Sequence, residues 1–209
     1  MNLIENLKWR YATKKFDATK KVSKKDLSTL KEAIQLSASS YGLQAYKVLI
    51  IEDAAIRQQL LPASWHQAQI TDASQLILFC NYTAVTPEYV DQCMALKSTV
   101  QSIPLEALKE FADSIKEGVE NMSSEEIKTW TAKQTYIALG NLLAACGELK
   151  IDACPMEGFE ADKYDAILGL AKKGLTSAVA AAIGYRSEED QMQFAPKVRK
   201  AVGDLFETI

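Results

Sequence analysis

The sequence contains one histidine, His66, among its 209 residues. Zinc sites that use two or three histidines are therefore excluded, and no cysteine cluster accompanies His66 to form a mixed site. A Ser-His-Asp triad would need the same residue, and the G-x-S-x-G motif of a nucleophile elbow does not occur. If the chain is an enzyme, we expect a bound cofactor to carry its chemistry.

The glycine motifs that hold nucleotide phosphates are also missing. Residues 169–174 have the glycine spacing of a P-loop, but Leu175 stands where that motif requires lysine, and no G-x-G-x-x-G occurs. The chain has no apolar run of about 18 residues, the length that a membrane helix requires. These absences exclude a P-loop, a dinucleotide-binding fingerprint and a membrane-spanning helix.

Charge and cysteine usage narrow the class of protein further. The formal net charge of −3 at pH 7 argues against nucleic-acid binding through a broad positive field. The first five residues lack the layout of a signal peptide. No C-x-x-C pair occurs, and Cys80, Cys146 and Cys154 lie in apolar segments, so we expect reduced, buried thiols. We therefore expect a cytoplasmic protein without nucleic-acid or membrane partners.

Hydrophobic patterns predict strands separated by helices. Apolar and β-branched runs predict strands at residues 46–51, 75–80 and 176–185. A capping box at residues 123–126 predicts the longest helix, roughly Ser124 to Leu149, and its apolar second half should be central. Helices outnumber strands, so we expect an α+β or three-layer α/β fold, built as one domain of residues 1–209.

Shorter helices are predicted from capping residues and periodicity. Ser23 should cap a helix that ends near Ala38, and Asp53 should cap one that runs through Leu60. Residues 65–69 then allow two interpretations. They begin another helix with a half-buried tryptophan, or they contact a ligand, and the sequence leaves both open.

Two regions are expected to pack on something outside the core. Residues 87–121 form a helical excursion, broken near residues 102–104, that either packs on a partner subunit or covers a site. The apolar residues that end the chain at 202–209 should dock in cis or on another chain.

Basic pairs lie near both ends of the chain. Arg10 and Lys14 belong to a mixed basic and aromatic segment, and Lys197 and Arg199 belong to a compact basic cluster. Each pair has two interpretations, as solvated surface charges or as cations that converge on an anion. The sequence alone does not decide between them.

A turn between two apolar elements, residues 154–159, is a candidate site. Pro155 cannot donate a hydrogen bond to a strand ladder, and Gly158 tolerates unusual backbone angles, so regular structure should stop here. The Glu157-Gly158 pair can point a backbone N–H at a ligand without a side chain in the way. On these grounds the turn is either a ligand-binding loop or an ordinary turn.

Taken together, these motifs resemble those of the FMN-dependent nitroreductase family, and the resemblance covers most of the chain. The matching segments occur in family order: residues 10–16 (RYATKKF), 38–46 (ASSYGLQAY), Lys133-Gln134 with Gly140-Asn141, 155–159 (PMEGF) and 196–199 (PKVR). The resemblance implies a central, mainly antiparallel sheet flanked by helices, in a domain-swapped homodimer with its sites at the interface.

The resemblance also implies which residues bind FMN. Arg10, Lys197 and Arg199 would hold the phosphate, Lys14 would lie near the pyrimidine edge, and the Glu157-Gly158 turn would place an N–H near N5. Ser39, Ser40 and Gln44 would come from the other subunit. The full implied set is Arg10, Tyr11, Ala12, Lys14, Ala38, Ser39, Ser40, Gly42, Gln44, Gln67, Gln69, Pro155, Met156, Glu157, Gly158, Lys197 and Arg199.

The implied reaction is a ping-pong hydride transfer through flavin N5, from NAD(P)H to a small nitroaromatic or quinone acceptor, with no catalytic side chain and no metal. The alternatives are a flavin, dihydropteridine or enone reductase on the same fold, or a flavin-binding protein without significant turnover. Three departures weaken the match. Ala12 replaces a hydroxyl residue, Ala38 and Ala45 replace prolines, and Gln67 and Gln69 are the candidates for contacts usually made by Asn and Lys.

Overall fold

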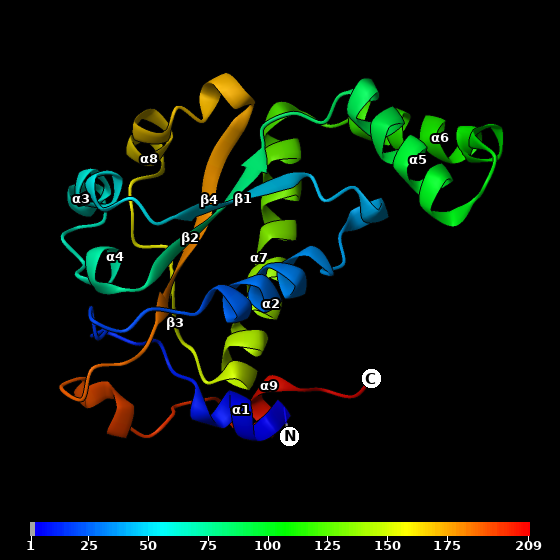
Figure 1. The fold of residues 1–209 in the computed structure, drawn as a ribbon. Helices are drawn as coiled ribbons and strands as arrows, with labels where there is room; N and C mark the ends of the chain where they lie inside the picture. The colour runs from blue at the N-terminus through cyan, green and yellow to red at the C-terminus, as the bar shows by residue number, and fades with distance from the viewer. Residues whose placement is uncertain (1–2) are drawn as a thin grey trace.

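One four-stranded sheet, in the order β1-β2-β4-β3, organises the chain. The computed structural model describes residues 3–209 (Figure 1). Every neighbouring pair of strands is antiparallel. The strands are β1 Tyr46–Ile51, β2 Gln75–Tyr82, β3 Asp152–Met156 and β4 Leu175–Gly184. The antiparallel sheet that the resemblance implied is therefore confirmed.

Strand β3 corrects one prediction. We expected regular structure to stop at residues 154–159, but Cys154, Pro155 and Met156 pair with β4 and only the residues after Met156 leave the sheet. Pro155 is tolerated because β3 is an edge strand in the part of the chain described, so one of its sides needs no continuous ladder of N–H donors. The turn is consequently shorter than expected and begins at Glu157.

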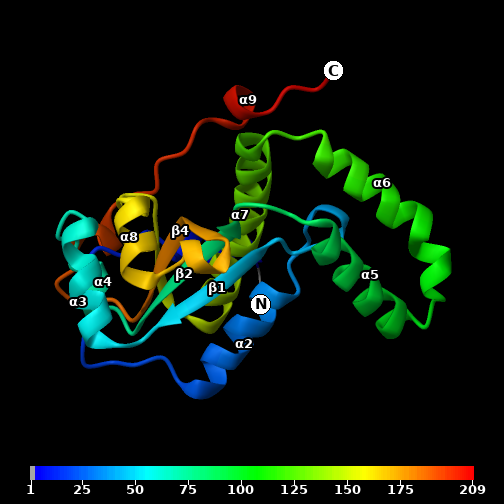
Figure 2. The ribbon, with the colours of Figure 1, turned by 90° about the horizontal axis from the view of Figure 1, so that it is seen from above.

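Helices cover both faces of the sheet, which gives the expected α+β three-layer arrangement (Figures 1 and 2). The helices are α1 Leu3–Trp9, α2 Lys24–Gln35, α3 Ala54–Ala63, α4 Gln69–Asp72, α5 Pro87–Gln101, α6 Lys109–Glu120, α7 Ser124–Leu149, α8 Ala161–Leu168 and α9 Val202–Leu205. The long helix α7 lies with α2 on one face, and α3, α4 and α8 lie on the other. The Ser123 capping box begins α7 at the predicted residue.

The central strands β2 and β4 are largely apolar because both of their faces are buried. In β2, Leu76 and Leu78 face the cluster under α3 and α8, whereas Ile77 and Phe79 face α7. Successive side chains of a strand point to opposite faces of the sheet. A strand with helices packed on both faces therefore has a continuous run of apolar residues in its sequence. This explains why the sequence identified β2 and β4 readily.

The connection between α3 and α4 differs from one of its two predicted forms. Trp65 and His66 adopt left-handed backbone angles, with φ of 52° and 56°, and both side chains are exposed. They form a turn, and α4 begins only at Gln69. The helix start with a half-buried tryptophan is therefore wrong. Ligand contact by this turn stays a prediction.

Helices α5 and α6 extend away from the sheet (Figure 2). Their inner faces form a separate apolar cluster that includes Val90, Met94 and Ile115, and Leu43 and Ala45 from the loop before β1 join it. The excursion is thus anchored to that loop. That residues 1–209 act as a single domain remains a prediction.

A matched pair of glycine substitutions tests the packing at the end of β4. A Cβ on Gly184 would lie 2.9 Å from the backbone nitrogen of Ser74, which cannot move because its own carbonyl and hydroxyl are bonded to Arg57 and Val22. We expect Gly184→Ala to lower the free energy of unfolding by about 1–3 kcal/mol. Gly118→Ala, in an open position of α6, should raise it by about 0.5–1 kcal/mol. Urea denaturation of both variants measures the difference, and equal effects would contradict this account.

Candidate functional site

The segment that follows α1 runs along the sheet edge next to β3. Ala12 forms a parallel bridge with Ala153 of β3, and Phe16 forms an antiparallel bridge with Arg186, just beyond β4. The backbone N–H of Asp17 donates to the carbonyl of Tyr185 at 2.8 Å. These contacts place Arg10 and Lys14 beside β3. Burial raises the pKa of the Cys154 thiol, and the positive charges of Lys14 and Arg10 offset part of that rise.

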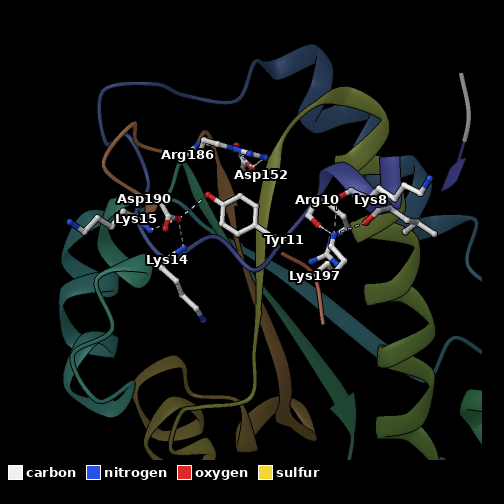
Figure 3. A network of polar contacts seen from close by, with 10 residues as sticks. Lys8, Arg10, Tyr11, Lys14, Lys15, Asp152, Arg186, Asp190 and Lys197 are labelled. Carbon is white, nitrogen blue, oxygen red and sulfur yellow. Dashed lines mark hydrogen bonds and ion pairs between the residues drawn. The ribbon is translucent and has the colours of Figure 1, made fainter. Parts of the chain in front are cut away.

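Asp190 fixes the backbone of this segment (Figure 3). Its carboxylate accepts hydrogen bonds from the N–H of Lys14 at 2.8 Å, the N–H of Lys15 at 3.1 Å and the hydroxyl of Tyr11 at 2.9 Å. Burial raises the pKa of Asp190, but these hydrogen bonds outweigh it, so the pKa lies below its ordinary value. With the backbone held in this way, the Lys14 side chain points away from that of Lys15 (Figure 3).

Asp190→Asn should reveal this contribution as a loss of stability that depends on pH. A carboxylate with a lowered pKa stabilises the fold above its ordinary pKa of 3.8, and this stabilisation disappears as pH falls through the lowered value. We expect the variant to lose about 2 kcal/mol of unfolding free energy at pH 7. The difference from wild type should shrink between pH 4 and the pKa of the folded carboxyl, measured by denaturant unfolding across pH. A constant difference would contradict the assignment.

Three cations meet without a counter-ion. Burial and repulsion by Arg199 lower the pKa of Arg10, and burial with repulsion by Arg10 and Arg199 lowers the pKa of Lys197. Within residues 3–209 no carboxylate pairs with any of the three, and the Nε of Arg10 is buried without a hydrogen-bond partner. Clustered cations that lack an anion favour the binding of one.

Lys197 has a second role in this cluster. Its ammonium donates to the carbonyl of Leu7 at 2.9 Å, to that of Lys8 at 3.0 Å and to that of Arg10 (Figure 3). It therefore caps the C-terminal end of α1, where a positive charge is favourable. This leaves the guanidinium groups of Arg10 and Arg199 as the main hydrogen-bond donors for an anion.

The turn after β3 is held from two sides. The hydroxyl of Tyr136 donates to the carboxylate of Glu157 at 2.6 Å, and the amide of Gln67 donates to the carbonyl of Gly158 at 2.7 Å. The N–H of Gly158 donates to no acceptor in the described chain. A Cβ at Gly158 would lie 3.0 Å from the Trp65 ring, so a side chain there would displace that ring. The turn thus presents a fixed, free N–H.

A second group of predicted residues lies elsewhere in the protomer. The loop of residues 39–44 lies toward α5, on the other side of α7 from α3 and α8 (Figures 1 and 2). It lines a pocket of about 900 Å³ between α2, β1 and α5. Gln134 of α7 holds this loop by accepting the N–H of Ser40 at 2.8 Å. One chain therefore does not bring Ser39, Ser40, Gly42 and Gln44 together with Arg10.

The remaining predicted residues vary in what they can offer a ligand. The amide NH₂ of Gln67 is bonded to Ser64 and Gly158, so only its carbonyl oxygen is free. Gln69 and Met156 are buried, and the Tyr11 hydroxyl already donates to Asp190. Ala12 and Pro155 lie along β3, and Ala38 is exposed at the end of α2. Whether these residues contact a cofactor stays a prediction.

Sequence reasoning missed the residues that support the site. Tyr136 lies on α7, and burial and its hydrogen bond to Glu157 raise its pKa to about 12. Asp190 is separated from Tyr11 by 179 positions. No local pattern marks either residue, because each acts through a contact that exists only in the folded chain.

Residues 3–209 contain no cluster of His, Cys, Asp or Glu side chains suited to a metal ion, and no helix among them has the length and apolarity to cross a bilayer. All four cysteines are free, and burial raises the pKa of Cys80 and Cys146 to about 12. The prediction of buried, reduced thiols is therefore confirmed for Cys80, Cys146 and Cys154.

The residues present fit an FMN. Arg10 and Arg199 can donate to a phosphate that carries about two negative charges. Lys14 is exposed and forms no ion pair in residues 3–209, so its charge is available to a ring system. The free N–H of Gly158 supplies a backbone donor. This donor set matches an aromatic cofactor with a terminal phosphate.

Known proteins resemble this chain in sequence and in fold. A protein of Staphylococcus aureus, provisionally named an NAD(P)H nitroreductase, is 36% identical over 220 residues, covering 99% of this chain and 95% of its own. The major NAD(P)H-flavin oxidoreductase of Aliivibrio fischeri is 37% identical over 212 residues, covering 98% and 97%. A solved structure from Exiguobacterium sibiricum in complex with FMN, provisionally named a nitroreductase, has a TM-score of 0.85 at 20% identity over 100% and 98% of the two chains.

The family model named Nitroreductase family matches residues 7–185 of the chain. This range contains all four strands and helices α2 to α8. The solved structure supports the same fold and, at 20% identity, nothing beyond the fold. The match over most of the sequence shows that this chain belongs to the nitroreductase family.

Proposed function

We propose that this protein binds FMN and uses NAD(P)H to reduce small electron-poor acceptors, nitroaromatics or quinones. The observation that carries the proposal is the cation cluster of Arg10, Lys197 and Arg199, which has no counter-ion in the described chain. Bound FMN supplies the two-electron chemistry that no side chain here provides. Membership of the nitroreductase family supports this reading.

Each residue of the site has a definite task under this proposal. Arg10 and Arg199 donate charge-assisted hydrogen bonds to the phosphate. Lys14 places a positive charge near the ring, where it stabilises negative charge that develops on reduction. The Gly158 N–H holds the orientation of the ring through one backbone hydrogen bond. Because the site provides positive charge and donors, it requires no general acid or base.

We further propose a homodimer with the sites at its interface. The loop of residues 39–44 would then serve the site of the other protomer, since it lies away from Arg10 in its own. The C-terminal segment supports this proposal because its apolar side chains are exposed to solvent in a single chain: Val198 is 84% and Phe206 is 68% exposed. Light scattering should give twice the chain mass of 23.1 kDa. A monomer would contradict the shared site.

Steady-state turnover tests the proposed activity. Protein reconstituted with FMN should oxidise NADH or NADPH when menadione or nitrofurazone is added, at rates well above those of free FMN. Binding of FMN without such turnover would instead indicate a flavin-binding protein. Comparison of NADH with NADPH in the same assay determines the preferred reductant.

Reduction of free flavin is the second candidate activity. The relative from Aliivibrio fischeri, which is 37% identical, is named an NAD(P)H-flavin oxidoreductase. Both activities use the same cofactor site and differ in the acceptor. Turnover with added riboflavin that exceeds turnover with menadione would favour this candidate.

A further inference from the structure

We propose that Arg186 is a positioning residue that directs Arg10 toward the cofactor phosphate. The proposal rests on the proposed function, because it assigns Arg10 to that phosphate. Arg186 follows β4 and is far from Arg10 in the sequence. Its guanidinium lies between two aromatic rings whose residues flank Arg10, Trp9 and Tyr11.

The contacts of Arg186 hold both neighbours of Arg10. The carbon at the centre of its guanidinium lies 4.5 Å from the centroid of the Trp9 ring and 4.6 Å from that of Tyr11. Both separations are within the range of cation–π attraction. Trp9 is the last residue of α1, and the N–H of Arg10 donates to the carbonyl of Asn6 at 3.0 Å, so the backbone of Arg10 is fixed between two residues whose rings contact Arg186. Figure 3 shows Arg10 beside Lys197, away from Arg186.

Arg186 is itself fixed, and this excludes a direct role as a phosphate ligand. Asp152, whose side chain is 4% exposed, accepts from the Arg186 Nε at 2.8 Å and from its backbone N–H at 2.8 Å. The Nη2 adds an ion-pair contact at 2.6 Å that is not aligned as a hydrogen bond. The charge of Arg186 is therefore neutralised within the protein. Its planar faces remain for the two rings.

A second cation also contacts the Trp9 ring. The ammonium of Lys150 lies 4.8 Å from the Trp9 ring centroid and donates to the side chain of Asn6 at 2.6 Å. Tyr11 is held at its far end by Asp190. Successive contacts thus link Lys150, Trp9, Arg186 and Tyr11 in one stack, in which Lys150 and Tyr11 are each hydrogen-bonded to a further side chain. A stack fixed in this way restricts the direction of Arg10.

Paired affinities for FMN and riboflavin test this role, because the two ligands differ only in the phosphate. We expect Trp9→Leu and Arg186→Lys each to weaken FMN binding by about tenfold, since the first removes the ring and the second removes the planar guanidinium that packs on it. Riboflavin affinity should stay within about twofold of wild type. Arg186→Lys keeps the ion pair with Asp152 but lacks a planar group to stack. Quenching of flavin fluorescence on titration with protein gives both dissociation constants.

Conservative and control variants separate positioning from a general structural effect. Trp9→Phe keeps a ring and should restore most of the preference for FMN over riboflavin. Glu5→Gln, on the same helix and away from the stack, should leave both affinities unchanged. Equal losses for FMN and riboflavin, or no loss in either stack variant, would overturn the proposal. Wild-type protein that binds neither ligand, or binds both equally, would instead overturn the assignment of the phosphate site on which the proposal rests.

Discussion

Replacing Arg10 with alanine should weaken FMN binding by about 100-fold, because hydrogen bonds to charged groups contribute about 1.5–3 kcal/mol each. The same substitution should leave the apoprotein as stable as wild type, or slightly more stable. Arg10 is repelled by Arg199 and Lys197 when no anion is present, and its Nε lacks a partner. Loss of affinity without loss of stability is the expected signature of a ligand-binding cation.

Two measurements on Arg10→Ala check this expectation. Titration with FMN, followed by flavin fluorescence, gives the dissociation constant, and thermal unfolding without FMN gives the stability. Lys8→Ala is the matched control, because Lys8 is an exposed cation on the same segment that pairs only with Glu5 at 3.0 Å. Equal FMN affinity in both variants would contradict the phosphate assignment. A large loss of apoprotein stability in Arg10→Ala would indicate a structural role instead.

Replacing Asp152 with alanine should lower the free energy of unfolding by about 3–5 kcal/mol. The substitution leaves the Arg186 guanidinium, whose side chain is 21% exposed, without its counter-ion, and it leaves the backbone N–H of Arg186 without an acceptor. A partly buried charge that loses its counter-ion costs more than an exposed pair contributes. We expect the loss of stability to include the segment beside β3, because Arg186 also forms a backbone bridge with Phe16 of that segment.

Denaturant unfolding at pH 7 measures the effect of Asp152→Ala. Glu189→Gln is the matched control, since Glu189 pairs with Lys15 at 3.5 Å and both side chains are mostly exposed. We expect this control to change stability by less than about 1 kcal/mol. Similar losses in the two variants would contradict the difference in burial that the structure shows.

Patterns that are local in sequence predicted much of the fold. The capping box placed the start of α7 at Ser124, and the apolar runs located β1, β2 and β4 because the strands are buried. Strand β3 was missed because it contains Pro155, which is tolerated only where the edge of the sheet leaves one side unpaired. The turn at Trp65 and His66 was missed because a bulky residue such as tryptophan rarely adopts a left-handed backbone.

The candidate site was predictable only for the residues that are proposed to bind the ligand directly. Arg10, Lys14 and Gly158 belong to short motifs, so the resemblance could name them. Arg186 and Asp190 contact residues that are more than 170 positions away in the sequence. Contacts at such separations produce no local sequence motif. The separation of residues 39–44 from Arg10 could likewise be seen only in the folded chain.

The most direct test of the central claim is the visible absorption spectrum of the purified protein with FMN, recorded anaerobically before and after addition of NADH. The account predicts a yellow protein that retains FMN through gel filtration and bleaches with NADH, while Arg10→Ala loses the flavin on the column. Protein that takes up no FMN, or that holds it without bleaching under NADH or NADPH, would contradict the claim. In the first case the cation cluster of Arg10, Lys197 and Arg199 would have to serve another anion.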